Sequence, residues 1–165
     1  MKETTIKTFY DFDNQLTHRN RSCLCRGVDD VSFNLTPSLF RHVVPTDIDL
    51  SETNMMWLFK THAVAFLQRV PASDLDWLTI AQHHGLPTRL LDWSLSPLVA
   101  CFFAVSRKPD VDGAVYIYDV IDFAKQEEID LKALTNITAF FPSHATKRVS
   151  AQSGMFTVHR SATCP

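Results

Sequence analysis

Glycine is scarce in this chain, with four residues in 165, at positions 27, 85, 113 and 154. A glycine-rich phosphate loop needs several glycines close together, so this spacing excludes one. The longest apolar run, residues 98–105, is far shorter than the roughly 20 residues of a membrane span. Residues 1–15 carry charges and no apolar segment, which argues against a signal peptide. We therefore expect no association with a membrane.

Cysteine is too rare for a disulfide scaffold, because four cysteines do not staple a domain of this size. Cys101 lies within the apolar run 98–105, and we expect it to be a small core residue. Together with the missing signal peptide, the cysteine content indicates a reducing, cytoplasmic compartment.

Acidic residues are absent after Asp130, although the whole chain has 18 Asp and Glu against 16 Lys and Arg, a net charge of −2. A chain without net positive charge produces no global field that attracts nucleic acid. Basic residues do gather in His18–Arg21 and in the acid-free C-terminal segment. This modest local charge leaves one alternative function open, a non-catalytic module that binds nucleic acid or protein.

Three helices are predicted from spacing and caps. Apolar residues recur every three or four positions over residues 51–70, which predicts an amphipathic helix ended by Pro71. Ser73 with Asp76 forms a capping-box pattern for a second helix, and Gly85 supplies its left-handed end. Ser96 with the proline that follows it caps a third helix. Residues 98–105 of that helix are apolar all round, which predicts burial on most sides.

Short strands are predicted at residues 23–27, 115–118 and 155–159, and residues 88–93 form a strand or an extended turn. Residues 1–20 form a first helix or an entry strand. The mixture lacks regular βαβ alternation, so we expect an α+β domain with a small mixed or antiparallel sheet and flanking helices. We divide the chain into an N-terminal extension (1–22), one domain (23–160) and a C-terminal tail (161–165), and we consider a truncation of a longer protein at this tail.

Several segments together carry a family resemblance that spans roughly residues 23–160. They are Cys25-Arg26-Gly27, Leu35–Arg41, Gln82–Ser94, Ser96–Ala100, Phe102–Ala104, and the closing Arg148, Ala151-Gln152, Gly154 and Phe156-Thr157. This set resembles the FRG domain, a family of bacteria and phages. The chain departs from the family at Cys25, where an aromatic residue is usual before Arg-Gly, and at Val28, where a polar residue is usual. The resemblance implies a fold and a site, and by itself no reaction.

The same segments are similar to the ADP-ribosyltransferase fold in their order along the chain. That similarity implies catalytic roles for Arg26 on an early strand, Ser94 before an apolar helix, and Gln152 before the last strand. It implies substrate binding by six neighbouring residues: Gly27, His84, Thr88, Arg89, Asp92 and Trp93. The ligand would be NAD or a related nucleotide, used as a substrate and not as a required cofactor. The activity would be ADP-ribosyl transfer or NAD hydrolysis.

The chemistry explains those residue types. An arginine presents a fork of donors to pyrophosphate oxygens, and a serine hydroxyl can fix the ribose beside nicotinamide. We expect Arg26, Asp92 and Ser94 to converge on one cleft. With no carboxylate after Asp130, Gln152 would act alone on the third side, and an amide does not offset developing positive charge. Binding is therefore better supported than catalysis.

Other interpretations of these residues remain open. Arg26 and Asp92 could be a structural ion pair between two strands. His83 and His84 could serve the end of their helix, where a cation is favourable. Cys23-x-Cys25 lacks the second pair of ligands that a zinc site needs, so we expect no metal. Cys25 as a nucleophile with His84 as its base is a further alternative.

Overall fold

The computed structural model describes residues 3–17, 23–42, 48–107, 110–142 and 154–160. Its helices and strands follow one another as α1 (Phe9–Thr17), β1 (Cys23–Val28), α2 (Ser38–His42), α3 (Ile48–Ala63), η1 (Val64–Phe66), α4 (Asp74–His83), β2 (Leu90–Ser94), α5 (Pro97–Val105), β3 (Ala114–Asp119), η2 (Gln126–Glu128), β4 (Thr138–Phe140) and β5 (Gly154–Val158). The predicted α+β class is confirmed. No helix in the described ranges is long and apolar enough to cross a membrane.

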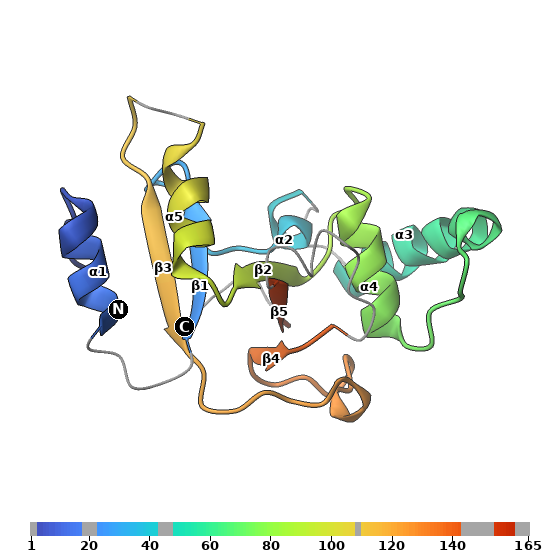
Figure 1. Ribbon diagram of the computed structural model, residues 1–165. Coiled ribbons are helices and arrows are strands. Elements are labelled where there is room, and N and C mark those ends of the chain that lie inside the picture. The colour runs from blue at the N-terminus through green and yellow to red at the C-terminus, as the bar shows by residue number, and fades with distance from the viewer. Residues whose placement is uncertain (1–2, 18–22, 43–47, 108–109, 143–153, 161–165) are drawn as a thin grey trace.

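The described strands form one five-stranded sheet in the order β3-β1-β2-β5-β4, and every neighbouring pair is antiparallel. β1 pairs with β3 along its whole length, and β2 pairs likewise with β5. β1 and β2, in contrast, meet in a single residue pair, Cys25 with Ser94. Figure 1 shows β1 and β3 upright and side by side, while β2 runs sideways, away from β1. Beyond this one pair β1 and β2 diverge, so the sheet opens between them.

The N-terminal segment forms helix α1, one of the two structures that the sequence left open for it. Thr8 and Asp11 bond reciprocally at its start: the Thr8 backbone N–H donates to Asp11 Oδ2 (3.0 Å), and the Asp11 N–H donates to Thr8 Oγ1 (3.1 Å). The Thr8 hydroxyl also donates to Asp11 Oδ2, and this bond lowers the pKa of that carboxyl.

The predicted limits of α4 are confirmed. Ser73 Oγ accepts from Asp76 N (3.1 Å), while Asp76 Oδ2 accepts from Ser73 N (3.2 Å), which completes the capping box. At the other end Gly85 has φ +87°, a left-handed conformation that glycine adopts without steric cost. Both signals are local, so they act whatever the helix packs against.

The predicted helix over residues 51–70 is wrong at its C-terminal end. α3 stops at Ala63, and the chain continues as the short 3₁₀ turn η1 before Leu67 becomes extended. Phe66 is 88 % exposed, so its helical spacing does not correspond to a buried face. An apolar stripe stabilises a helix only where another element covers it, and η1 contains no buried residue.

Helix α5 starts where predicted, with Ser96 Oγ accepting from Val99 N (3.5 Å) and Pro97 in the first position. It also lies beside β3, as expected from the sequence (Figure 1). Its backbone packs directly on β1 and β3, because a Cβ built on Gly27 would lie 1.8 Å from the carbonyl oxygen of Ala100. A Cβ on Gly113 would likewise lie 2.1 Å from the oxygen of Ala104.

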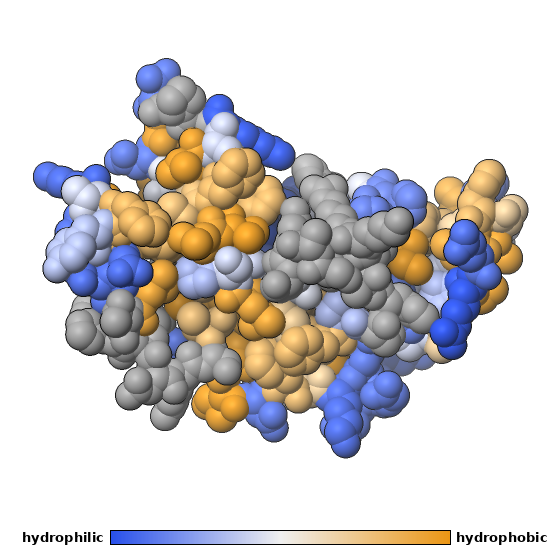
Figure 2. Space-filling model, viewed as in Figure 1, coloured by the Kyte–Doolittle hydropathy of each residue, from blue (hydrophilic) through white to orange (hydrophobic). Residues whose placement is uncertain are grey.

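The expected burial of α5 on most sides is wrong. Ala100 and Ala104 are its buried residues, while Leu98, Phe102 and Val105 are 58, 63 and 67 % exposed. Cys101, expected in the core, is only half-buried. Figure 2 shows this outer face as an apolar surface. Small residues allow the close approach to β1, so the large apolar residues lie on the side that no described element covers.

Strand β2 has a hydrophobic cluster on each face. Leu90 packs with α4 residues such as Leu78 and with Phe156, whereas Leu91 and Trp93 pack in a second cluster with Leu24 and Met155. Buried on both faces, β2 is the centre of the fold. Its one exposed position is Asp92. The carboxylate of Asp92 therefore marks the position at which β2 meets solvent.

Candidate functional site

A pocket of about 410 Å³ lies where β1 and β2 diverge, and we call it the β1–β2 pocket. Its wall includes Arg26 from β1 and Asp92, Trp93 and Ser94 from β2. The loop after β1, helices α2, α4 and α5, and the start of β5 complete the wall. The expected convergence of Arg26, Asp92 and Ser94 is therefore present in the structure, across 66 residues of sequence between the first two.

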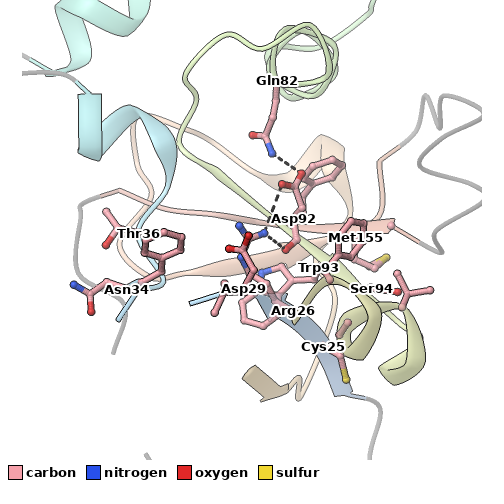
Figure 3. Close-up of a pocket in the computed structure, with 18 of the residues that line it drawn as sticks. Cys25, Arg26, Asp29, Asn34, Thr36, Gln82, Asp92, Trp93, Ser94 and Met155 are labelled. Atoms are coloured by element: carbon pink, nitrogen blue, oxygen red, sulfur yellow. Dashed lines mark hydrogen bonds and ion pairs between the residues drawn. The ribbon is translucent and has the colours of Figure 1, made fainter. Parts of the chain in front are cut away.

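Arg26 holds Asp92 at the pocket wall (Figure 3). Arg26 Nη1 donates to the Asp92 backbone oxygen (2.7 Å) and lies 3.6 Å from Asp92 Oδ2. The structural pair that the sequence left open is thus present. The Asp92 side chain is 60 % exposed, however, and an exposed ion pair adds at most about 1 kcal/mol to stability. The main effect of the pair is to orient Arg26 and Asp92 at the pocket, and its contribution to the stability of the fold is small.

Gln82 fixes the other side of the Asp92 carboxylate. Its Nε2 donates to Asp92 Oδ1 (2.5 Å), and its Oε1 accepts from the Thr88 hydroxyl. Thr88 Oγ1 also accepts from Leu90 N (3.2 Å). Figure 3 shows Gln82 reaching from α4 toward Asp92. With Arg26 on one side and Gln82 on the other, Asp92 has a defined orientation at the pocket.

Trp93 and Ser94 line the pocket but have partners in the fold. The Trp93 indole N–H donates to Thr157 Oγ1 (2.8 Å), which ties β2 to β5. Ser94 is 6 % exposed, and its Oγ accepts from Ser96 N (3.0 Å) at the start of α5. Gly27 also lines the pocket, and its missing Cβ lets α5 approach β1.

Three of the residues expected to bind substrate do not line the pocket: His84, Thr88 and Arg89. Thr88 is buried and positions Gln82. His84 lies at the end of α4, with its ring 6.3 Å from that of Phe59. Gln152 lies outside the described residues, although Gly154, which opens β5, is at the pocket wall.

Arg89 belongs to a buried ion pair on α3. Its Nε donates to Glu52 Oε2 (2.6 Å) and its Nη2 donates to Asp49 Oδ1 (2.7 Å). Burial lowers the pKa of Arg89, but the hydrogen bonds and charges of Glu52 and Asp49 outweigh this effect and raise the pKa above its ordinary value. The role of Arg89 in this structure is to hold β2 to α3.

Three charged residues of the pocket were missed by the sequence reasoning: Asp29, Arg41 and Arg107. Arg41 is the last residue of Leu35–Arg41, one of the segments that resemble the FRG domain. This resemblance was the one sequence feature that could have pointed to Arg41. Arg107 follows the C-terminus of α5, where a cation has an ordinary explanation in the helix dipole. Nothing in the spacing along the chain indicated that the two share a pocket.

Behind the pocket, a buried polar chain continues from Trp93 through Thr157 to His159. Since Thr157 Oγ1 accepts from Trp93, its own proton is available for His159 Nε2 at 2.8 Å. His159 Nδ1 then carries the ring proton, and no hydrogen-bond partner for it occurs in the described part of the chain. His159 is fully buried, and this burial lowers its pKa to about 4.

This buried histidine predicts a loss of stability in acid. Between its ordinary pKa of 6.5 and the folded value of about 4, the unfolded chain binds the proton more readily than the folded one. Stability is therefore complete above pH 6.5 and falls as the pH drops toward 4, by about 3 kcal/mol. Urea unfolding of the wild type and of His159→Gln at pH 7 and pH 4 isolates this contribution. Equal acid losses in the two proteins would contradict the assignment.

No group of three or more His, Cys, Asp or Glu residues gathers as metal ligands in the ranges that the structure describes. Cys23 Sγ and Cys25 Sγ lie 4.0 Å apart. The polar and aromatic groups of the pocket wall include arginines, carboxylates, two amides and aromatic rings. Such a set can hold an organic anion that carries hydroxyl groups.

Comparison with known proteins gives one match. The family model of the FRG domain matches residues 21–113, which are 93 of the 165 residues. No curated protein and no solved structure matches the chain. The matched range contains the charged residues of the pocket, Arg26, Asp29, Arg41, Asp92 and Arg107, and ends before β3. Since the match covers more than half of its residues, the chain belongs to the FRG domain family.

Proposed function

We propose that the β1–β2 pocket binds NAD or a related nucleotide that contains ADP-ribose. The observation that carries this proposal is the meeting of Arg26 with Asp92, Trp93 and Ser94 at one pocket, where the sheet opens after a single residue pair. A volume of about 410 Å³ falls within the range typical of small-molecule sites.

The chemistry of the wall suits the parts of such a nucleotide. Guanidinium groups bind phosphate oxygens through paired donors. The carboxylates of Asp29 and Asp92 can accept from ribose hydroxyls, and Phe33 and Phe103 offer aromatic surface for a base. Ser94 ends β2, two residues after Asp92 and two residues before Ser96, the N-cap of α5.

Cleavage of NAD is the reaction that this arrangement would support. The bond between ribose C1′ and the nicotinamide nitrogen breaks, and its electron pair leaves with nicotinamide. Water, or the hydroxyl group of an acceptor, then adds to C1′ and loses a proton. A carboxylate near C1′ stabilises the positive charge that develops on the ribose. Asp92 can supply that charge from β2, although the sequence after Asp130 contains no acidic residue.

Binding without turnover is the second candidate, and one observation favours it. Asp92 already bonds with Gln82 and lies beside Arg26. A carboxylate whose charge is compensated in this way offers less stabilisation to a developing cation. Nicotinamide release, followed with NAD as the only added substrate, distinguishes turnover from binding alone.

Arg26→Lys tests the nucleotide proposal. Lysine keeps the charge but loses the planar fork that bonds Asp92, so we expect NAD and ADP-ribose to bind at least about tenfold more weakly, as for the loss of one charge-assisted hydrogen bond. Stability should fall by no more than about 1 kcal/mol, because the Asp92 side of the pair is exposed and solvent screens it. Calorimetric titration gives the affinities and thermal melting gives the stability.

Arg69→Lys is the matched control, because Arg69 is exposed and does not line the pocket. It should bind as the wild type does. The proposal fails if the wild-type protein binds neither NAD nor ADP-ribose at millimolar concentration. It also fails if Arg26→Lys binds both ligands normally.

A further inference from the structure

Two arginines at the pocket have no acidic partner among the residues that the structure describes. Arg41 on α2 and Arg107 after α5 both line the pocket, and both are exposed. In the described ranges neither lies within 4.0 Å of a carboxylate oxygen. The contrast with Arg89 is clear, since Arg89 bonds two carboxylates. Two arginines from separate elements thus line one pocket, and neither has an acidic partner among the described residues.

The charges of the pocket wall favour an anion. Arg26 is neutralised by Asp92, which leaves Arg41 and Arg107 against the single carboxylate of Asp29. Each arginine stands near the C-terminus of a helix, where a cation is favourable. That position explains a cation on each helix separately, but it does not explain why both line the same pocket.

Arg26 is less suited to bind phosphate than its place on β1 suggests. Its Nη1 donates to the Asp92 backbone oxygen at 2.7 Å and lies beside the Asp92 carboxylate. An anion that took this guanidinium would have to displace Asp92, whose carboxylate would then lie next to the anion. Like charges this close repel each other. Arg26 therefore acts as a positioning residue for Asp92.

We infer that Arg41 and Arg107 form a phosphate subsite, and that the ligand class is a nucleotide with a pyrophosphate group. One guanidinium binds one phosphate group through a pair of donors, and two guanidinium groups on separate elements suit two linked phosphates. This inference rests on the proposed function for its nucleotide part, while its phosphate part is independent. Phe33 lines the same pocket and is 44 % exposed, and an aromatic ring can stack on a base.

The test uses three probes by calorimetry: inorganic pyrophosphate, ADP-ribose and uncharged adenosine. Arg41→Gln and Arg107→Gln should each weaken the binding of pyrophosphate and ADP-ribose about tenfold or more, because each removes charge-assisted hydrogen bonds. The double variant should lose measurable pyrophosphate binding. Adenosine should bind all variants equally, and the dependence of ADP-ribose affinity on salt should become shallower.

Controls keep the result specific. Arg69→Gln removes an exposed arginine away from the pocket and should bind all three probes as the wild type does. Arg26→Lys should keep its affinity for pyrophosphate while it loses affinity for ADP-ribose. Thermal melting of each variant checks that it is folded, which we expect because both substituted arginines are exposed.

The outcomes separate the two proposals. The phosphate subsite is wrong if the double variant binds pyrophosphate and ADP-ribose as tightly as the wild type does. It is also wrong if the single substitution Arg26→Lys abolishes pyrophosphate binding while the arginine-to-glutamine variants keep it. If pyrophosphate binds through Arg41 and Arg107 while NAD and ADP-ribose do not bind, the phosphate subsite stands and the nucleotide proposal is wrong. If the wild type binds none of these phosphates, both are wrong.

Discussion

Replacing Gly27 by alanine should destabilise the protein by about 3 kcal/mol or more, since overpacking a tight contact costs 1–3 kcal/mol and at times more. The new Cβ would lie 1.8 Å from the carbonyl oxygen of Ala100 and 2.8 Å from the nitrogen of Ala104. Both atoms belong to the backbone of α5, so no side-chain rotation relieves the contact and the helix has to move away from β1. Urea unfolding of the variant measures the loss.

The same displacement should weaken ligand binding, because Val99, Ala100 and Phe103 of α5 line the pocket. Gly85→Ala is the matched control. A Cβ there has open space within 4 Å, and the substitution meets only the cost of φ +87°, about 1–2 kcal/mol. Gly85 is also absent from the pocket wall. A Gly27→Ala protein as stable as Gly85→Ala would show that α5 does not pack on β1 as described.

Replacing Glu52 by glutamine should cost about 3–5 kcal/mol, the loss typical of breaking a buried ion pair on one side. Glu52 and Arg89 are 8 and 4 % exposed, and their contact is 2.5 Å between Oε2 and Nη2. Removing the carboxylate charge leaves a buried guanidinium with Asp49 as its remaining acidic partner. Denaturant unfolding at pH 7 measures the change.

Asp49→Asn serves as the control on the same guanidinium. The side chain of Asp49 is 82 % exposed, so its loss should cost no more than about 1 kcal/mol. The double variant Arg89→Met with Glu52→Leu should recover much of the loss, because an apolar pair of similar size leaves no buried charge. Equal losses for Glu52→Gln and Asp49→Asn would contradict the difference in burial. None of these variants should alter nucleotide affinity, since Asp49, Glu52 and Arg89 do not line the pocket.

Much of the candidate site could be predicted from local sequence. The segment Gln82–Ser94 ends α4 and contains β2, and with Arg26 it supplies the groups that meet around Asp92. We expected Arg26 and Asp92 to meet across 66 residues because each lies near the end of a short strand-like segment, and the structure brings the two together. The sequence could not place Arg41 and Arg107 at the pocket, because no motif or spacing relates these two positions to each other or to Asp92.

The sequence by itself determined where α4 and α5 begin, since a serine cap and the residues that follow it bond within one turn. It also determined the α+β class and the strands around residues 23–27, 115–118 and 155–159. Tertiary structure alone decided which side of α5 is buried, because the sequence of an all-apolar helix indicates no preferred face. The buried face is the one on which Ala100 and Ala104 pack against Gly27 of β1. It likewise decided that Arg89 pairs with Glu52, 37 positions away. Local spacing carries no information about contacts over such distances, so only the packed sheet and helices could place those side chains.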